Sequence, residues 1–173
     1  MTANALSEVE NDSQRWPKRY LRVVSYGIAA AVLLADIVTK YLAVSLLSNE
    51  PPVEVFWTLQ WHLSFNSGAS FSRAQGLGQW IGVLVVVVVI FLLRSRLSTL
   101  SRGHAVATGL ILGGAVGNLV DRIFRAADGL MSGSVVDFVD FQFFPIFNVA
   151  DSAIVIGVLV LVLSEFRISR RNS

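Results

Sequence analysis

Aspartate and asparagine side chains gather at the ends of long apolar stretches of this chain. Ionisable groups at membrane depth are costly and are functional by default, so these positions are the first candidates for chemistry. Single positions have simpler explanations, since Asp151 would favour a helix start and Arg122 would anchor a helix at an interface. Several such residues together are better explained by a functional site. The candidates are Asn66, Asn118, Asp121, Arg122, Asp137, Asp140, Asn148 and Asp151.

Paired carboxylates are the chemistry that these residue types allow. The chain has no cysteine, and its two histidines, His62 and His104, are not at a metal-ligand spacing. Two close carboxylates share one proton, so that the charged one can deprotonate water while the protonated one hydrogen-bonds a scissile carbonyl. This hydrolysis needs no metal and no cofactor. The residue types alone do not decide which aspartates form the pair.

The composition places these residues in a membrane protein. Of the 173 residues, 54% are hydrophobic and 15% are charged, whereas soluble domains carry about 25% charged residues. The net charge of +2 is too small to indicate nucleic-acid binding. Four apolar runs, over residues 23–47, 77–93, 104–120 and 147–166, have the length of membrane helices. We expect a membrane all-α bundle of four transmembrane helices, forming one domain over residues 15–173 after a disordered tail over residues 1–14.

Basic residues predict the orientation of the bundle. If the N-terminus is inside, only Arg73, Arg122 and Arg125 lie outside. Both termini are therefore expected in the cytoplasm, with the aspartates and asparagines near the outer leaflet. The basic residues on the inner side would be Arg15, Lys18, Arg19, Arg22, Arg94, Arg96, Arg102, Arg167, Arg170 and Arg171.

The outer segments carry signals for extended structure. Apolar and polar residues alternate over residues 53–65, which predicts a half-buried strand. Trp57 and Trp61 suit a membrane interface. We expect a small extracytoplasmic β-strand segment here, resting on the bilayer or on the helices. The run Val135-Val136-Asp137-Phe138 also predicts extended chain.

Two features of the helices are best explained by packing. Asp36 and Lys40 are four residues apart and can pair on one helix face, and such buried pairs often serve structure. The Asp36 carboxylate would also keep Lys40 protonated, which disfavours serine–lysine catalysis. A serine–histidine arrangement is not expected, because His62 and His104 belong on opposite membrane sides.

Glycines spaced by four form a stripe along the third apolar run. Gly109, Gly113 and Gly117 would lie on one face of a helix there. Small residues at this spacing let helix backbones approach closely. We expect packing between helices as the role of the stripe, and self-association of the chain is also possible.

Five short motifs resemble those of one enzyme family. Each motif is weak alone, but the five in this order within a four-span chain resemble lipoprotein signal peptidase, also called signal peptidase II. The resemblance covers residues 20–166. The motifs are Asp36-Ile37-Val38-Thr39-Lys40, Asn66-Ser67-Gly68-Ala69-Ser70-Phe71-Ser72, Gly117-Asn118-Leu119-Val120-Asp121-Arg122, Val135-Val136-Asp137-Phe138 and Phe147-Asn148-Val149-Ala150-Asp151-Ser152.

The resemblance implies an intramembrane aspartic protease of the bacterial cytoplasmic membrane. Members of this family remove signal peptides from prolipoproteins by cleaving before a diacylglyceryl-modified cysteine. The implied partners are such prolipoproteins and membrane lipid, with no nucleic acid, metal or cofactor. The catalytic aspartates of the family's VVDF and FNxAD motifs match Asp137 and Asp151.

The same resemblance implies supporting roles for the other motif residues. Substrate binding or support of the dyad falls to Asn66, Gly68, Asn118, Arg122 and Asn148, and a structural role falls to Asp36, Lys40 and Asp121. The chain departs from the family in two places. The connection over residues 123–134 is longer than usual, and Ser70 replaces a frequent alanine.

Two other functions stay open at this level. The carboxylates could form the relay of a small proton- or ion-coupled transporter. Their position at helix ends and the lack of an inverted repeat argue against that interpretation. A non-enzymatic assembly protein is the third possibility, and it predicts that the outer acids can all be replaced harmlessly.

Overall fold

The computed structural model describes residues 16–67, 77–126 and 131–172. The tail expected over residues 1–14 lies outside the described residues, and so do Gly68, Ser70 and Arg73. The connection over residues 123–134 is described except for residues 127–130.

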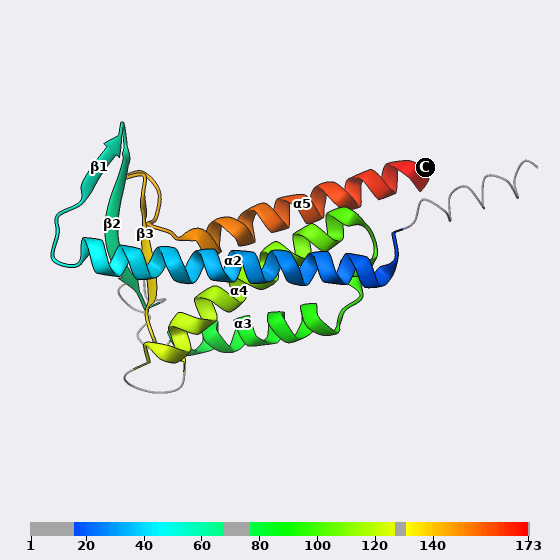
Figure 1. The fold of residues 1–173 in the computed structure, drawn as a ribbon, viewed down its shortest axis with the longest axis horizontal. Coiled ribbons are helices and arrows are strands. Elements are labelled where there is room, and N and C mark those ends of the chain that lie inside the picture. The colour runs from blue at the N-terminus through cyan, green and yellow to red at the C-terminus, as the bar shows by residue number, and fades with distance from the viewer. Residues whose placement is uncertain (1–15, 68–76, 127–130, 173) are drawn as a thin grey trace, which may run out of the picture.

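The described part contains four helices that are long and apolar enough to cross a membrane. They are α2 (Lys18–Leu47), α3 (Leu77–Arg94), α4 (Arg102–Phe124) and α5 (Val149–Asn172), and a short 3-10 helix, η1 (Leu97–Thr99), lies between α3 and α4. The predicted four-helix membrane bundle is therefore confirmed (Figure 1).

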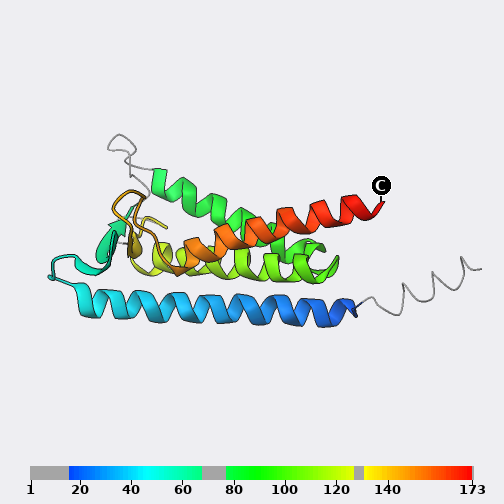
Figure 2. The same ribbon diagram turned by 90° about the horizontal axis from the view of Figure 1, so that it is seen from above.

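Helix α4 is the central helix of the bundle. It lies between α2 on one side and α3 and α5 on the other (Figure 2). The most apolar stretch of α4 is 61% buried, compared with 17% for each of the other three helices. The outer helices expose large apolar side chains such as Leu34, Val87 and Leu159, as a lipid-facing surface requires.

The glycine stripe brings α4 against α2. A Cβ atom added at Gly109 would lie 2.5 Å from the Ser25 carbonyl oxygen, and one added at Gly113 would lie 2.7 Å from that of Ala29. Real side chains do not tolerate such distances to backbone atoms, so glycine is what permits this contact. The packing role predicted for the stripe is confirmed, and its partner is a helix of the same chain.

A three-stranded antiparallel sheet lies at one end of the bundle (Figure 1). Its strands are β1 (Val53–Phe56), β2 (Leu59–Asn66) and β3 (Val135–Asp140), in the order β1-β2-β3. The single strand predicted over residues 53–65 is therefore wrong in detail. Trp57 adopts a left-handed conformation, with φ of 52°, and turns the chain into a hairpin. The prediction failed because the alternation of apolar and polar residues continues through this turn.

Strand β3 is anchored in the interior, unlike β1. Val136 and Phe138 form a buried cluster with Ala43 of α2. In the register of β2 with β3, Ser64 lies across from Asp137 and Asn66 across from Val135. The extended segment predicted around Asp137 is confirmed. The sheet therefore holds Asp137 at the junction between the strands and the helix ends.

Candidate active site

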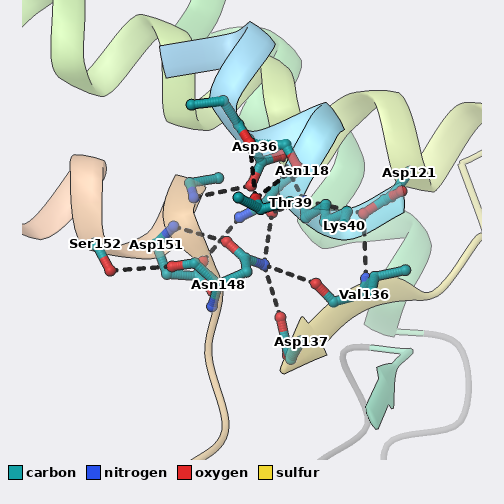
Figure 3. A network of polar contacts seen from close by, with 12 residues as sticks. Asp36, Thr39, Lys40, Asn118, Asp121, Val136, Asp137, Asn148, Asp151 and Ser152 are labelled. Atoms are coloured by element: carbon teal, nitrogen blue, oxygen red, sulfur yellow. Dashed lines mark hydrogen bonds and ion pairs between the residues drawn. The ribbon is translucent and has the colours of Figure 1, made fainter. Parts of the chain in front are cut away.

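A buried lysine forms the centre of the contacts between α2 and α4. Lys40 is 3% exposed, and its Nζ lies 2.7 Å from Asp36 Oδ2 and 3.0 Å from Asp121 Oδ2. The same atom donates to Asn118 Oδ1 at 2.9 Å. Asp36 and Lys40 thus pair as their spacing predicts, and the pair extends to the end of α4 (Figure 3).

The start of α5 is tied to this group of residues through its N-cap. Asn148 Oδ1 accepts from the backbone N–H of Asp151 at 2.9 Å, and Asp151 Oδ2 accepts from the N–H of Asn148 at 3.2 Å. This reciprocal pair has the geometry of a capping box. Asp36 Oδ1 accepts from the N–H of Ala150 at 3.0 Å. The first turn of α5, with Asp151 on it, is therefore fixed against α2.

Two amide side chains connect the aspartates (Figure 3). Asn148 Nδ2 donates to Asp137 Oδ1 at 2.7 Å, and Asn118 Nδ2 donates to Asp151 Oδ1 at 2.8 Å. Asn66 Nδ2 donates to the other oxygen of Asp137 at 3.0 Å. Asn148 thus contacts both carboxyl groups, one with its side chain and the other with its backbone.

The surroundings of Asp137 perturb its protonation. Asp137 is 2% exposed, and burial is the main reason that its pKa is raised to about 6. The nearby charge of Asp151 raises the pKa further, whereas the hydrogen bonds from Asn66 and Asn148 and the charge of Lys40 lower it. A carboxyl group with a raised pKa beside a second carboxyl group has the properties of a proton-sharing pair.

Arg122 supplies positive charge to the same region. It is 5% exposed, at the end of α4. Its guanidinium interacts electrostatically with Asp137 and Asp151. Buried carboxyl groups need such compensation, because an isolated charge is costly in a dry interior.

The structure divides the candidate aspartates into three environments. Asp121 Oδ1 accepts from Arg125 Nε at 2.8 Å, and its Oδ2 accepts from the backbone N–H of Val136 at 3.1 Å, so this carboxylate joins α4 to β3. Asp140 lies farther along β3, where its Oδ2 accepts from Gln60 Nε2 at 2.7 Å. That hydrogen bond is the main cause of a lowered pKa for Asp140. Among the aspartates that the structure describes, only Asp137 and Asp151 have Asn148 as a hydrogen-bond partner in common, Asp137 through its side chain and Asp151 through the Asn148 backbone.

The two histidines lie apart from this cluster. His62 Nδ1 lies 3.0 Å from Asp140 Oδ2 on the sheet, and His104 Nδ1 lies 2.8 Å from Ser101 Oγ. A serine–histidine contact is therefore present at the start of α4, although no catalytic arrangement of this kind was expected from the sequence. Ser101 is the N-cap of α4, and its hydroxyl also accepts from the His104 backbone N–H, so the three-residue spacing of a helix start was the signal that could have found it.

Within the described residues, no group of three or more histidines, aspartates or glutamates could hold a metal ion. The arrangement that the described residues do offer is a carboxyl pair, buried at Asp137 and partly buried at Asp151, with amide donors on both members and an arginine that interacts electrostatically with them. Such a pair can activate water and polarise a carbonyl group.

A sequence model described as "Signal peptidase (SPase) II" matches residues 28–167. This chain belongs to the signal peptidase II family. A lipoprotein signal peptidase of Mycobacterium avium (strain 104) is 50% identical over 155 residues, which are 87% of this chain and 82% of that protein. A lipoprotein signal peptidase of Mycobacterium leprae (strain Br4923) is 46% identical over 169 residues, 95% of this chain and 82% of that protein.

The fold is also similar to that of a solved membrane protein. A solved structure described as a bacterial membrane enzyme superposes with a TM-score of 0.69 at 30% identity, covering 81% of this chain and 90% of that chain. As a signal peptidase II with four apolar helices, the chain is a protease and a multi-pass protein of the inner membrane. This membership argues against the transporter and scaffold alternatives.

Proposed function

We propose that this chain removes signal peptides from prolipoproteins by cleaving before the lipid-modified cysteine, with Asp137 and Asp151 as the catalytic dyad. Its membership in the signal peptidase II family supports the substrate. The assignment of the dyad depends on the contacts of Asn148. Its side chain donates to Asp137 Oδ1 at 2.7 Å, and its backbone N–H donates to Asp151 Oδ2 at 3.2 Å. This one residue holds both carboxyl groups in one place.

The two carboxyl groups take different roles in the proposed reaction. Asp137, with its raised pKa, holds the shared proton. Asp151 accepts a proton from water, and the resulting hydroxide oxygen bonds to the carbonyl carbon while Asp137 protonates the carbonyl oxygen. The C–N bond then breaks as Asp151 returns its proton to the leaving nitrogen and one hydroxyl returns a proton to Asp137. This cycle restores the dyad and forms no covalent intermediate.

The neighbours of the dyad are assigned to its support. Asn66 and Asn148 orient the Asp137 carboxyl group, since each donates to one of its oxygens. Arg122 compensates the charge of the dyad. Gly68 remains a proposed substrate contact and lies outside the described residues.

The proposed location of the reaction is near the outer leaflet, with both termini in the cytoplasm. The sheet and the start of α5 lie at one end of the bundle, and the start of α2 lies at the other (Figure 1). The basic residues Arg22 and Arg102 are near the start of α2 and α4, respectively. Trp57, at the tip of the β1–β2 hairpin, is 83% exposed, as an interfacial aromatic residue would be.

The deciding experiment uses the purified full chain and a synthetic diacylglyceryl lipopeptide. Mass spectrometry should map the cut to the bond before the modified cysteine. Asp137→Asn and Asp151→Asn should each abolish cleavage, with loss of rate of at least about 1,000-fold, because a neutral amide cannot take part in the proton transfers. Their thermal melting should stay close to that of the parent chain.

Asp140→Asn is the matched control. Asp140 lies on the same strand as Asp137 but interacts with Gln60 and His62 instead of the dyad. It should leave cleavage nearly unchanged. Substantial cleavage by either dyad variant would refute the assignment of the catalytic residues.

A further inference from the structure

The side-chain amide of Asn118 lies between a cationic and an acidic side chain. Its Oδ1 accepts from Lys40 Nζ at 2.9 Å, and its Nδ2 donates to Asp151 Oδ1 at 2.8 Å. An ammonium group has three donors and no acceptor. The end of the amide that faces Lys40 must therefore be oxygen, and the nitrogen must face Asp151.

Asn148 is the other candidate to hold this orientation, but its amide is already committed. Its Nδ2 has two hydrogens and lies near three acceptors: Asp137 Oδ1 at 2.7 Å, Asn118 Oδ1 at 3.2 Å and the Val136 carbonyl oxygen at 3.3 Å. The shortest contact goes to Asp137. The two remaining acceptors compete for one hydrogen, so Asn148 is the weaker restraint on Asn118.

Lys40 can fulfil this role because its charge is balanced where it lies. Its ammonium lies between the carboxylates of Asp36, at 2.7 Å, and Asp121, at 3.0 Å. Arg125 pairs with Asp121 at 2.8 Å, so two cations face two carboxylates. A buried ion pair persists only with such compensation and good geometry. Asn118 Oδ1 is then a third oxygen around the Lys40 ammonium, and it accepts a hydrogen bond from it.

We propose that Lys40 is a positioning residue whose ammonium fixes the amide of Asn118 so that this amide donates to Asp151. Its catalytic consequence rests on the proposed function of the Asp137–Asp151 dyad. If the amide turned over, its oxygen would face a carboxylate oxygen, and Asp151 would lose a donor that favours its charged form. Lys40 therefore acts on the dyad through Asn118, beyond its pairing with Asp36.

The test uses a variant that keeps the net charge. Asp36→Asn combined with Lys40→Met removes one positive and one negative charge, and asparagine still offers an acceptor to the N–H of Ala150. The control is Asp36→Asn alone, which keeps the ammonium beside Asn118. A second variant, Asn118→Asp, keeps an acceptor for Lys40, removes the amide donor to Asp151 and adds a negative charge beside that carboxyl group.

The readouts separate positioning from general stability. In lipopeptide cleavage, the double variant should lose about 100-fold in kcat, with little change in KM, and the acidic limb of its pH profile should move to higher pH. Asn118→Asp should show the same two changes. The NMR signal of the Asn118 side-chain amide, assigned through Asn118→Ala, should move in the double variant. In Asp36→Asn alone, neither the Asn118 amide signal nor the acidic limb of the pH profile should move.

An unmoved Asn118 amide signal in the double variant would overturn the inference, and so would a pH profile of Asn118→Asp that matches the parent chain. If the double variant does not fold, an unchanged pH profile in Asn118→Asp would still overturn the link from Asn118 to Asp151 on which the inference depends. If the parent chain fails to cleave the lipopeptide, the proposed function fails. The NMR signal then still decides whether Lys40 orients Asn118.

Discussion

Asn148 combines a structural and a chemical role at a single residue. Its Oδ1 caps α5 by accepting from the N–H of Asp151, while its Nδ2 contacts Asp137. An asparagine at an N-cap is common on its own. The position is distinctive because the same side chain has a second end, and that end faces a carboxyl group from another element.

Asn66 offers a test of the protonation state of Asp137. Its hydrogen bond favours the charged form and so lowers the pKa of Asp137, which burial otherwise raises to about 6. In the proposed mechanism Asp137 must hold a proton, so cleavage falls as pH rises through the upper apparent pKa of the dyad. Asn66→Ala removes the donor and should raise the pKa of Asp137. The alkaline limb of the pH–rate profile should therefore move to higher pH.

Ser64→Ala is the control for this measurement. Ser64 lies two residues earlier on β2, across from Asp137. Of these two polar side chains, only Asn66 donates to the Asp137 carboxyl group in the described part of the chain. The alkaline limb should not move in Ser64→Ala. A limb that moved to lower pH in Asn66→Ala would contradict the role given to Asn66.

At the scale of elements, α4 depends on close approach to α2. Gly113→Ala would place a Cβ 2.7 Å from the Ala29 carbonyl oxygen and 2.8 Å from Val32 Cβ. The backbone of α2 cannot move away without disturbing Asp36 and Lys40 farther along the helix. We expect a loss of about 1–3 kcal/mol in stability, as for other overpacked cores. Thermal melting in detergent would measure it.

Gly27→Ala is the matched control on α2 itself. A Cβ atom at Gly27 would meet nothing within 4 Å. Alanine also favours a helix more than glycine does. The melting temperature should therefore be kept or slightly raised. Equal destabilisation by the two substitutions would show that the close contact between α2 and α4 is not what glycine serves.

At the scale of the whole molecule, the sheet lies at one end of the bundle and the start of α2 lies at the other (Figure 1). The chain has no cysteine, so single cysteines can report on each end. Trp57→Cys should react with a membrane-impermeant maleimide added outside sealed cells. Arg167→Cys should react only after the membrane is opened. The reverse pattern would contradict the proposed orientation.

Much of the architecture was predictable from local sequence. The length of a membrane-spanning helix follows from bilayer thickness. The four apolar runs of that length in the sequence therefore predicted the four helices that the structure contains. The boundary of the hairpin was not predictable in the same way, because the left-handed conformation of Trp57 leaves no mark on the alternation of side chains. The contact of Ser101 with His104 was predictable in principle, because it is a local contact at a helix cap and does not require the two histidines to lie on the same side of the membrane.

The sequence by itself determined the four spans, the glycine stripe and the pairing of Asp36 with Lys40, because each follows from spacing within one helix. Only the tertiary structure decided how the aspartates are divided. Asp121 joins Lys40 and Arg125, Asp140 joins Gln60, and Asp137 shares Asn148 with Asp151. These partners lie on different elements, so the register of β2 with β3 and the packing of α5 against α4 select them. The type of a residue and its spacing to near neighbours do not show which residues of other elements it will contact.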